Sequence, residues 1–167
     1  MKTLHKPLCW LILQLLATLG VLAVAGGLDY VRHPDTPSYL KAAEAESWTE
    51  ALSHNRAIGY PLFLRTVTST GLWLGPVPPI QILLFFGSLL LFWNAIRRIS
   101  GSGWLAWAVV LPMPWAGIMA LGNVVLPDFL AGTAAVVAVS CLLMLVAGPP
   151  RAVWWTGLGT AVFCAYQ

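Results

Sequence analysis

The chain has 167 residues, of which 59% are hydrophobic and only 9% are charged, with a formal net charge of +3. Soluble domains carry about 25% charged residues, so this composition, together with a mean hydropathy of +0.79, indicates an integral membrane protein. The nine basic residues are few and scattered along the sequence, which argues against a surface that follows a phosphate backbone and therefore against nucleic acid as a partner.

The first apolar run covers residues 8–27 and is preceded by Lys2 and Lys6. A signal peptide is the competing interpretation, because Ala23-Val24-Ala25 resembles a cleavage site. The run is longer than the roughly 7–15 residues of a signal-peptide core, and further apolar segments follow it. We therefore predict a retained first transmembrane helix over 8–27.

Residues 28–75 form a polar interlude that holds five of the six acidic residues. Thr36 and Pro37 have the residue types of the N-cap and first position of a helix, and an apolar stripe predicts that this helix runs to about Leu52. A second short helix is predicted from Pro61 to about Gly71. Two amphipathic helices joined by a polar turn would lie in the membrane interface rather than cross it.

Four further apolar segments complete the predicted fold, which is a single all-α membrane domain over 1–167. The last segment is too short for the roughly 30 Å hydrocarbon core at about 1.5 Å per residue, so we expect four complete spans, a partial fifth and a truncated chain. The third span is interrupted by Pro112 and Pro114, a break that neighbouring helices can tolerate. The predicted segments are 79–97, 103–121, 125–147 and 152–167.

The charges predict the orientation of these spans. One group of basic residues lies at the N-terminus and in the loops after the second and fourth spans, namely Lys2, Lys6, Arg97, Arg98 and Arg151. By the positive-inside rule these positions are cytoplasmic, so the 28–75 loop, with most of the acids, is extracytoplasmic. Tryptophans near span ends are expected to be interfacial anchors: Trp10, Trp73, Trp93, Trp104, Trp154 and Trp155.

The cysteines and histidines do not predict a metal site. Cys9, Cys141 and Cys164 lie inside apolar runs without CxxC spacing and are expected to be small buried hydrophobic residues. The three histidines also lack metal-ligand spacing. We predict no resident cofactor, while participation of a divalent metal stays open.

Two carboxylates on the predicted outer side are the candidate catalytic residues. Asp35 opens the first amphipathic helix, and Asp128 follows Pro127 at the start of the fourth span. Each could serve only to stabilise a helix N-terminus. An ionisable residue at a span end among apolar neighbours is nevertheless a functional hypothesis by default.

Three short motifs, in this order and on this predicted side of the membrane, suggest a family. They are "DTPSYLKAA" at the start of the outer loop, "GYPLFL" in the second interfacial helix, and "LPDFLAG" at the start of the fourth span. Taken together they resemble the amino-terminal part of polyprenyl-phosphate-dependent glycosyltransferases of the C-type membrane fold. That group includes the protein O-mannosyltransferases and the lipid A aminoarabinose transferases.

The resemblance implies an activity and roles for particular residues. A sugar would pass from a polyprenyl-phosphate carrier, which is a substrate and not a cofactor, to an extracytoplasmic acceptor. Asp35 would be the general base and Asp128 the second acidic position, with Tyr39, Arg56 and Arg65 as substrate-binding residues. Three departures stand out. Many members carry two adjacent acids where this chain has Asp35 and Thr36, and the second acid, here Asp128, is more often Glu. The later spans of the family are also missing. We therefore expect this chain alone to be inactive.

Two other classes compete with this interpretation. A small non-enzymatic membrane protein could act as a subunit or assembly partner, docking through the small-residue faces of the fourth and fifth spans. A transporter would be expected to show a repeat of broken helices, and no internal repeat is present in the sequence. The expected location is a bacterial inner membrane, with an ER membrane as the alternative. The sugar, the acceptor and the oligomeric state are not predicted.

Overall fold

The structure is a computed structural model that describes residues 5–24, 34–53, 59–68, 74–114, 127–149 and 151–165. Every regular element within these ranges is a helix, which confirms the predicted all-α class. The helices are α1 (His5–Val24), α2 (Thr36–Glu44), α3 (Trp48–Ser53), α4 (Gly59–Thr68), α5 (Val77–Ser100), α6 (Gly103–Val110), α8 (Pro127–Ala147) and α9 (Ala152–Ala165).

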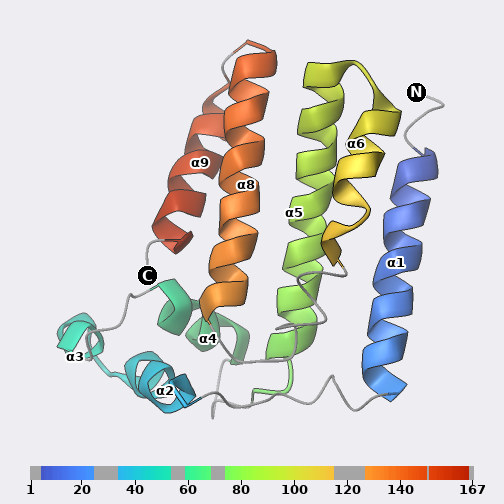
Figure 1. The fold of residues 1–167 in the computed structure, drawn as a ribbon. Coiled ribbons are helices and arrows are strands. Elements are labelled where there is room, and N and C mark those ends of the chain that lie inside the picture. Colours follow the sequence, from blue (N-terminus) through green and yellow to red (C-terminus); the bar gives the residue numbers. More distant parts are fainter. Residues whose placement is uncertain are drawn as a thin grey trace.

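The long helices stand side by side, and the short helices α2, α3 and α4 gather at one end of them (Figure 1). We call this the lower end and the opposite one the upper end. Helix α5 packs against α8 and α6, and α8 packs against α9. The last residues of α1 and the first residues of α5 and α8 all lie at the lower end. The polar interlude and the start of α8 are therefore brought to the same end of the bundle.

Local sequence explains where α5 begins and ends. Pro76 is its N-cap and Pro78 lies in its first turn, where a missing N–H costs nothing because that group has no partner within the helix. Gly101 ends the helix with a left-handed φ of 66°, a conformation that glycine adopts without a Cβ clash. Arg97 and Arg98 lie in the last turn, where a positive charge is favourable to the helix dipole.

Two of the four predicted complete spans have the required length and hydropathy within the described residues. These are α5, predicted as 79–97, and α8, predicted as 125–147. The apolar part of α1 that qualifies, Cys9–Val24, is shorter than a full span. Helix α9 covers the predicted segment 152–167 as far as Ala165.

The third predicted span, 103–121, is not one continuous helix, because α6 ends at Val110. Leu111 and then Pro112 follow, and a proline has no N–H to donate to the preceding turn. The amide Nε2 of Gln14 in α1 donates to the carbonyl of Leu111 at 3.4 Å. Neighbouring helices can in this way satisfy backbone groups near the point where a helix is interrupted. The remainder of this segment, 115–126, lies outside the described residues.

The predicted helix from Thr36 to about Leu52 is wrong as a single element. Asp35, not Thr36, is the N-cap, and α2 ends at Glu44 because Ala45 adopts an extended conformation. Helix α3 then starts anew: Ser47 Oγ accepts the N–H of Glu50 at 3.2 Å, and Glu50 Oε2 accepts the N–H of Glu46 at 3.0 Å. This reciprocal cap supplies partners for N–H groups that a helix start leaves unsatisfied. The second short helix is confirmed as α4, which begins two residues before Pro61.

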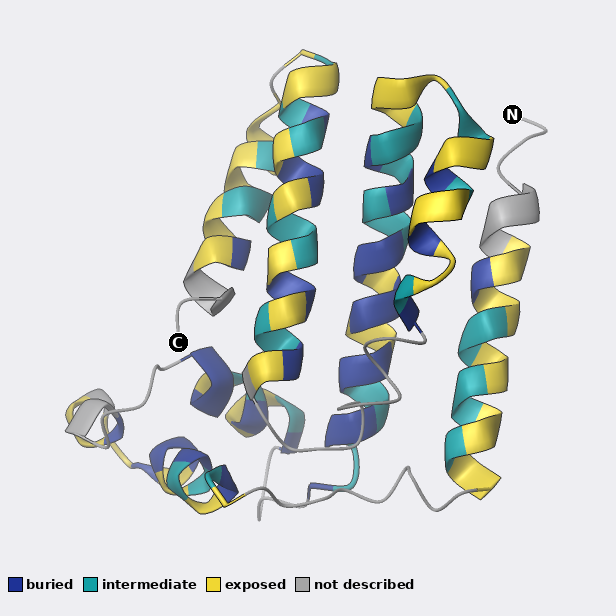
Figure 2. Cartoon of the chain, in the orientation of Figure 1, coloured by how far each residue is buried: buried dark blue, intermediate teal, exposed yellow. Residues whose placement is uncertain are grey.

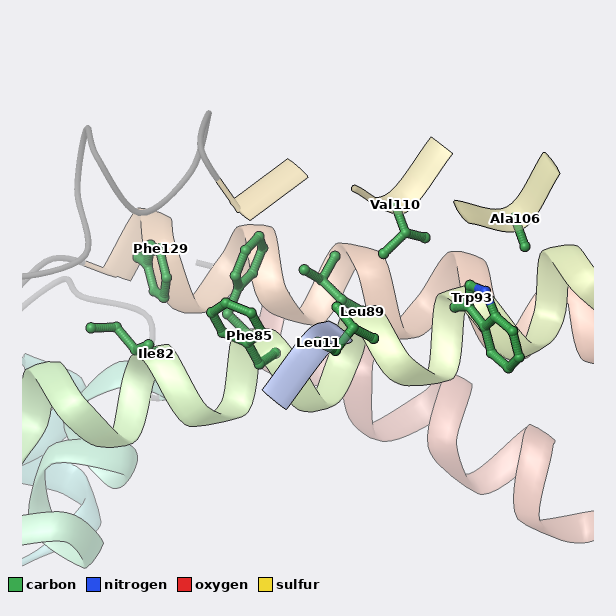
Figure 3. Close-up of a cluster of buried hydrophobic side chains, with 9 residues drawn as sticks. Leu11, Ile82, Phe85, Leu89, Trp93, Ala106, Val110 and Phe129 are labelled. Carbon is green, nitrogen blue, oxygen red and sulfur yellow. The ribbon is translucent and has the colours of Figure 1, made fainter. Parts of the chain in front are cut away.

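A hydrophobic core joins α1, α5, α6 and α8 (Figure 3). Its residues include Leu11, Ile82, Phe85, Leu89, Trp93, Ala106, Val110 and Phe129. Trp93 was expected to be an interfacial anchor, and this is wrong, because it is only 4% exposed. Its ring lies 6.3 Å from that of Trp107 in α6, and the guanidinium of Arg97 lies 5.2 Å from it.

Much of the apolar surface of the long helices remains exposed (Figure 2). Only 44% of the most apolar stretch of α5 and 33% of that of α8 are buried. Large side chains such as Trp104 and Val146 are more than three-quarters exposed, at 84% and 80%. Soluble monomers rarely expose contiguous apolar patches larger than a few hundred Å². A helix that is apolar on every side is instead typical of a protein interior or a bilayer.

Candidate functional site at the lower end of the bundle

A second buried cluster holds α2 and α4 against the bundle. Tyr39 and Ala43 of α2 meet Tyr60 and Leu64 of α4, together with Leu74 and Val77 at the start of α5. Tyr39 meets Tyr60 edge-on, with ring centroids 5.4 Å apart, and Tyr60 stacks on Phe63 at 5.8 Å. Leu130 of α8 packs against the same cluster. Helices α2 and α4 and the acidic start of α8 therefore share one apolar support.

Tyr60 also makes a polar contact inside this cluster. Its side chain is 0% exposed, and its hydroxyl donates to Oε1 of Gln81 in α5 at 3.4 Å. Burial raises the pKa of the phenol well above its ordinary value, and neighbouring Tyr39 raises it further. The phenol is therefore neutral and serves as a donor, because a buried phenolate would lose its hydration.

Asp35 lies at the lower end as the N-cap of α2 and is partly buried. Its side chain makes no capping hydrogen bond. Its backbone carbonyl instead accepts the N–H of Ser38 at 3.1 Å and the Ser38 hydroxyl at 2.7 Å. The backbone around Asp35 is thus fixed by Ser38, and the carboxylate is not used as the helix cap. This arrangement removes one purely structural role for the side chain.

Asp128 lies in the first turn of α8 and is exposed. The next two residues anchor that turn: Phe129 packs against Phe85 with centroids 5.4 Å apart, and Leu130 contacts the α2–α4 cluster. The turn that carries Asp128 is consequently held between both hydrophobic clusters. Asp35 and Asp128 come from elements at the same end of the molecule (Figure 1).

The other candidate residues differ in their surroundings. Tyr39 is 8% exposed and packs in the aromatic cluster, so most of its ring is covered by protein. Arg65 is exposed, and its Nη1 donates to the carbonyl of Ala45 at 3.3 Å, which links α4 to the end of α2. Arg56 lies outside the described residues. Substrate binding by these three residues stays a prediction.

A pocket of about 240 Å³ opens between α2, α3 and α4. Its walls combine two opposite charges, Glu46 and Arg65, with a hydroxyl and small apolar groups, among them Ala42, Ala43, Ser47 and Pro61. A second and more apolar groove of about 520 Å³ lies between α5, α8 and α9. Among the described residues, no cluster of His, Cys, Asp or Glu has the arrangement of a metal site.

The described carboxylates all lie at one end of the bundle, whereas basic residues lie at both, because Lys41 of α2 and Arg65 of α4 are at the lower end. Arg97 and Arg98 end α5, and Arg151 precedes α9, at the upper end. The described carboxylates belong to α2, α3, their connection and the start of α8 at the lower end: Asp35, Glu44, Glu46, Glu50 and Asp128. The described acids thus lie at the end opposite Arg97, Arg98 and Arg151, the basic residues from which the positive-inside rule predicts the orientation.

Sequence reasoning missed three residues of this region. Tyr60 and Gln81 are 21 positions apart, and no local pattern links a tyrosine and a glutamine at that distance. Glu46 was counted only as a loop acid, although it lines the pocket. The S-x-x-E pattern of Ser47 and Glu50 is a recognised helix-start signature. It could have placed Glu46 at the junction between α2 and α3, because Glu50 Oε2 accepts the N–H of Glu46.

Comparison of this sequence with known protein families, with curated proteins and with solved structures finds no match.

Proposed function

We propose that this chain is an integral membrane protein whose lower end faces the extracytoplasmic side. Support comes from the length and hydropathy of α5 and α8, from the exposed apolar side chains along the bundle, and from the position of Arg97, Arg98 and Arg151 at the end opposite the described carboxylates. Helices α2–α4 would then lie at the level of the lipid headgroups, with their shared aromatic cluster against the bundle.

On this membrane, the protein contributes the acceptor-activating part of a glycosyltransferase that uses a polyprenyl-phosphate sugar. One observation carries the proposal: the Asp35 and Asp128 elements lie at the same end of the molecule, and a common apolar cluster contacts both. A sugar carried by a membrane lipid is presented at this interface. The three sequence motifs that suggested the family lie on α2, α4 and the start of α8.

In the proposed reaction Asp35 acts as the general base. The acceptor oxygen attacks the anomeric carbon and gives its proton to the carboxylate, while the bond from that carbon to the phosphate oxygen breaks and the lipid phosphate leaves. A carboxylate serves here because it can hold a proton within hydrogen-bond reach of the nucleophile. A cation that meets the leaving phosphate lowers the barrier, and Arg65 is the described arginine on these helices.

The test is sugar transfer in membranes of the native organism, with the gene deleted and restored as wild type or variant. Asp35→Asn keeps the shape of the side chain but cannot take up the proton, so we expect transfer to fall by at least about 100-fold. Glu44→Gln removes an exposed carboxylate from the same helix and should leave transfer unchanged. Full transfer by correctly inserted Asp35→Asn would exclude the base assignment.

The groove between α5, α8 and α9 favours a second function, that of a subunit that docks another membrane helix. Thr133, Ala134, Gly157 and Ala161 are among the residues that line it, and small residues allow close approach of helices in membranes. For this function, Thr160→Leu should fill the groove and lower the mass of the detergent-solubilised complex. Asp35→Asn should leave that mass unchanged, and an unchanged mass with Thr160→Leu would count against docking there.

A further inference from the structure

The pocket between α2, α3 and α4 carries one negative and one positive side chain that do not neutralise each other. Glu46 and Arg65 both line it, yet no ion pair joins them among the described residues. The Glu46 side chain has no hydrogen-bond partner within that part of the chain. Arg65 donates one N–H to the carbonyl of Ala45. A guanidinium has five N–H donors, so most of its donor capacity remains for a ligand.

The size and remaining walls of the pocket restrict what it can hold. Its volume of about 240 Å³ is below the roughly 300–1,000 Å³ of pockets that enclose drug-sized molecules. The apolar surfaces of Ala42, Ala43 and Pro61 surround the two charges. These features suit a small zwitterionic group that is attached to an apolar chain. The pocket is too small for a whole lipid or a sugar chain.

We propose that this pocket binds the headgroup of an aminophospholipid, with its phosphate on Arg65 and its primary ammonium on Glu46. Arginine holds phosphate oxygens through paired N–H donors, and a primary ammonium offers three donors to a carboxylate. The inference rests on the interfacial position of α2–α4 proposed above and does not depend on glycosyl transfer. At that level of the bilayer, phospholipid headgroups are the most abundant zwitterions.

The same chemistry discriminates between common headgroups. A choline group has no N–H to donate, and proteins that select it surround it with aromatic rings. None of the described side chains that line the pocket is aromatic. A glycerol headgroup brings the phosphate but no cation for Glu46, and its negative charge would face that carboxylate. The pocket should therefore prefer ethanolamine over both choline and glycerol headgroups.

The experiment is native mass spectrometry of the intact protein, delipidated in detergent and mixed with equimolar phosphatidylethanolamine, phosphatidylcholine and phosphatidylglycerol of the same acyl chains. We expect the ethanolamine lipid to be retained about fivefold over the choline lipid, the scale of a partly solvent-exposed ion pair. Glu46→Gln should abolish this preference. Arg65→Gln should reduce the retention of all three phospholipids.

Matched variants distinguish binding in this pocket from a general effect of surface charge on lipid retention. Glu44→Gln and Lys41→Gln change exposed charges on α2 outside the pocket and should leave the lipid preference as in the wild type. Arg65 also holds the end of α2, so Glu46→Gln, whose side chain has no bond to lose, is the decisive variant. Equal retention of the three lipids, or a preference that survives Glu46→Gln, would overturn the proposal. Release of the protein from membranes by an alkaline wash would instead refute the membrane position.

Discussion

The hydroxyl of Tyr60 lies 3.4 Å from Oε1 of Gln81 and joins the short helix α4 to the long helix α5 inside the protein. The side chains are 0% and 1% exposed, respectively. The Nε2 of Gln81 is buried without a hydrogen-bond partner among the described residues. This contact is therefore a polar link at the point where α4 meets the bundle. Because both side chains are buried, water would not replace the hydrogen bond if it were lost.

Tyr60→Phe should destabilise the protein by about 1 kcal/mol, because it leaves the Gln81 carbonyl oxygen buried without a donor. The long donor–acceptor distance places the cost at the low end of the usual range. The measurement is the free energy of unfolding by denaturant in detergent micelles. The double variant Tyr60→Phe/Gln81→Leu removes both partners and should regain part of the loss. If the cost of the double variant equalled the sum of the costs of Tyr60→Phe and Gln81→Leu, the proposed link would be contradicted.

The raised pKa of Tyr60 predicts that stability falls at alkaline pH. The folded phenol keeps its proton above the ordinary tyrosine value of about 10, whereas the unfolded phenol releases it. Below about pH 10 both states are protonated and this group adds no pH dependence. As the pH rises further, the unfolded state binds fewer protons, so the free energy of unfolding decreases. Tyr60→Phe should flatten this decline, as followed by thermal melting between pH 8 and 11.

An absorbance titration of tyrosinate checks the same assignment independently of the melting measurement. The sequence has four tyrosines, and the phenol of Tyr60 should titrate only when the fold opens. Tyr60→Phe should remove this late phase and leave the earlier ones. A late phase that persists in the variant would show that another tyrosine is the protected one.

Ser47→Ala should loosen α3. Ser47 Oγ accepts the N–H of Glu50 at 3.2 Å, and loss of such a cap costs about 0.5–2 kcal/mol of helix stability. A six-residue helix has little stability of its own, so amide exchange in Trp48–Ser53 should become faster while the long helices are unaffected. Thr49→Ala, at an exposed position of the same helix, is the control. Equal exchange rates in the two variants would refute the role of the cap.

The sequence predicts those parts of the fold that depend on local signals. Hydropathy gives α5 and α8, and Pro78 and Gly101 mark the two ends of α5. The split between α2 and α3 was missed because the apolar stripe continues through Trp48 and hides the competing helix start at Ser47. The stripe is a preference summed over many residues, whereas the cap satisfies particular N–H groups, and the cap decides the boundary.

Contacts between segments that are distant in the sequence could not be predicted from local signals. Trp93 has the position of an interfacial anchor, but the chain turns at Gly101 and α6 returns along α5, which covers the ring with Trp107. Asp35 and Asp128 were expected on one side of the membrane from charge counts alone. Their shared support through Tyr39, Tyr60 and Leu130 needs the packing of three helices, which no single segment encodes.

The position of Arg97, Arg98 and Arg151 at the end opposite the described carboxylates predicts opposite sides for two exposed positions, Thr49 in α3 and Pro149 between α8 and α9. In a chain freed of its three cysteines, Thr49→Cys should react with an impermeant maleimide on intact cells. Pro149→Cys should react only after the membrane is opened, because the neighbouring Arg151 favours the cytoplasmic side. Labelling of both from one side would refute the spanning arrangement, and exchanged labelling would reverse the orientation.

Helices α8 and α9 approach closely at Gly157, and two glycines of α9 provide a matched comparison. A Cβ added at Gly157 would lie 3.0 Å from Sγ of Cys141, whereas one at Gly159 would meet no heavy atom within 4 Å. Gly159→Ala should be neutral or stabilising by up to about 1 kcal/mol through helix propensity. Gly157→Ala gains the same propensity but must displace a sulfur that is 2% exposed and enclosed by helices.

We expect Gly157→Ala to be about 1–2 kcal/mol less stable than Gly159→Ala, the usual scale of overpacking in a filled interior. Unfolding in mixed detergent micelles measures the difference. The double variant Cys141→Ala/Gly157→Ala removes the sulfur that the new methyl would strike, so it should bring the stability closer to that of Cys141→Ala alone. If Gly157→Ala and Gly159→Ala were equally stable, α8 and α9 would not be held at this distance, and small-residue packing would not explain their contact.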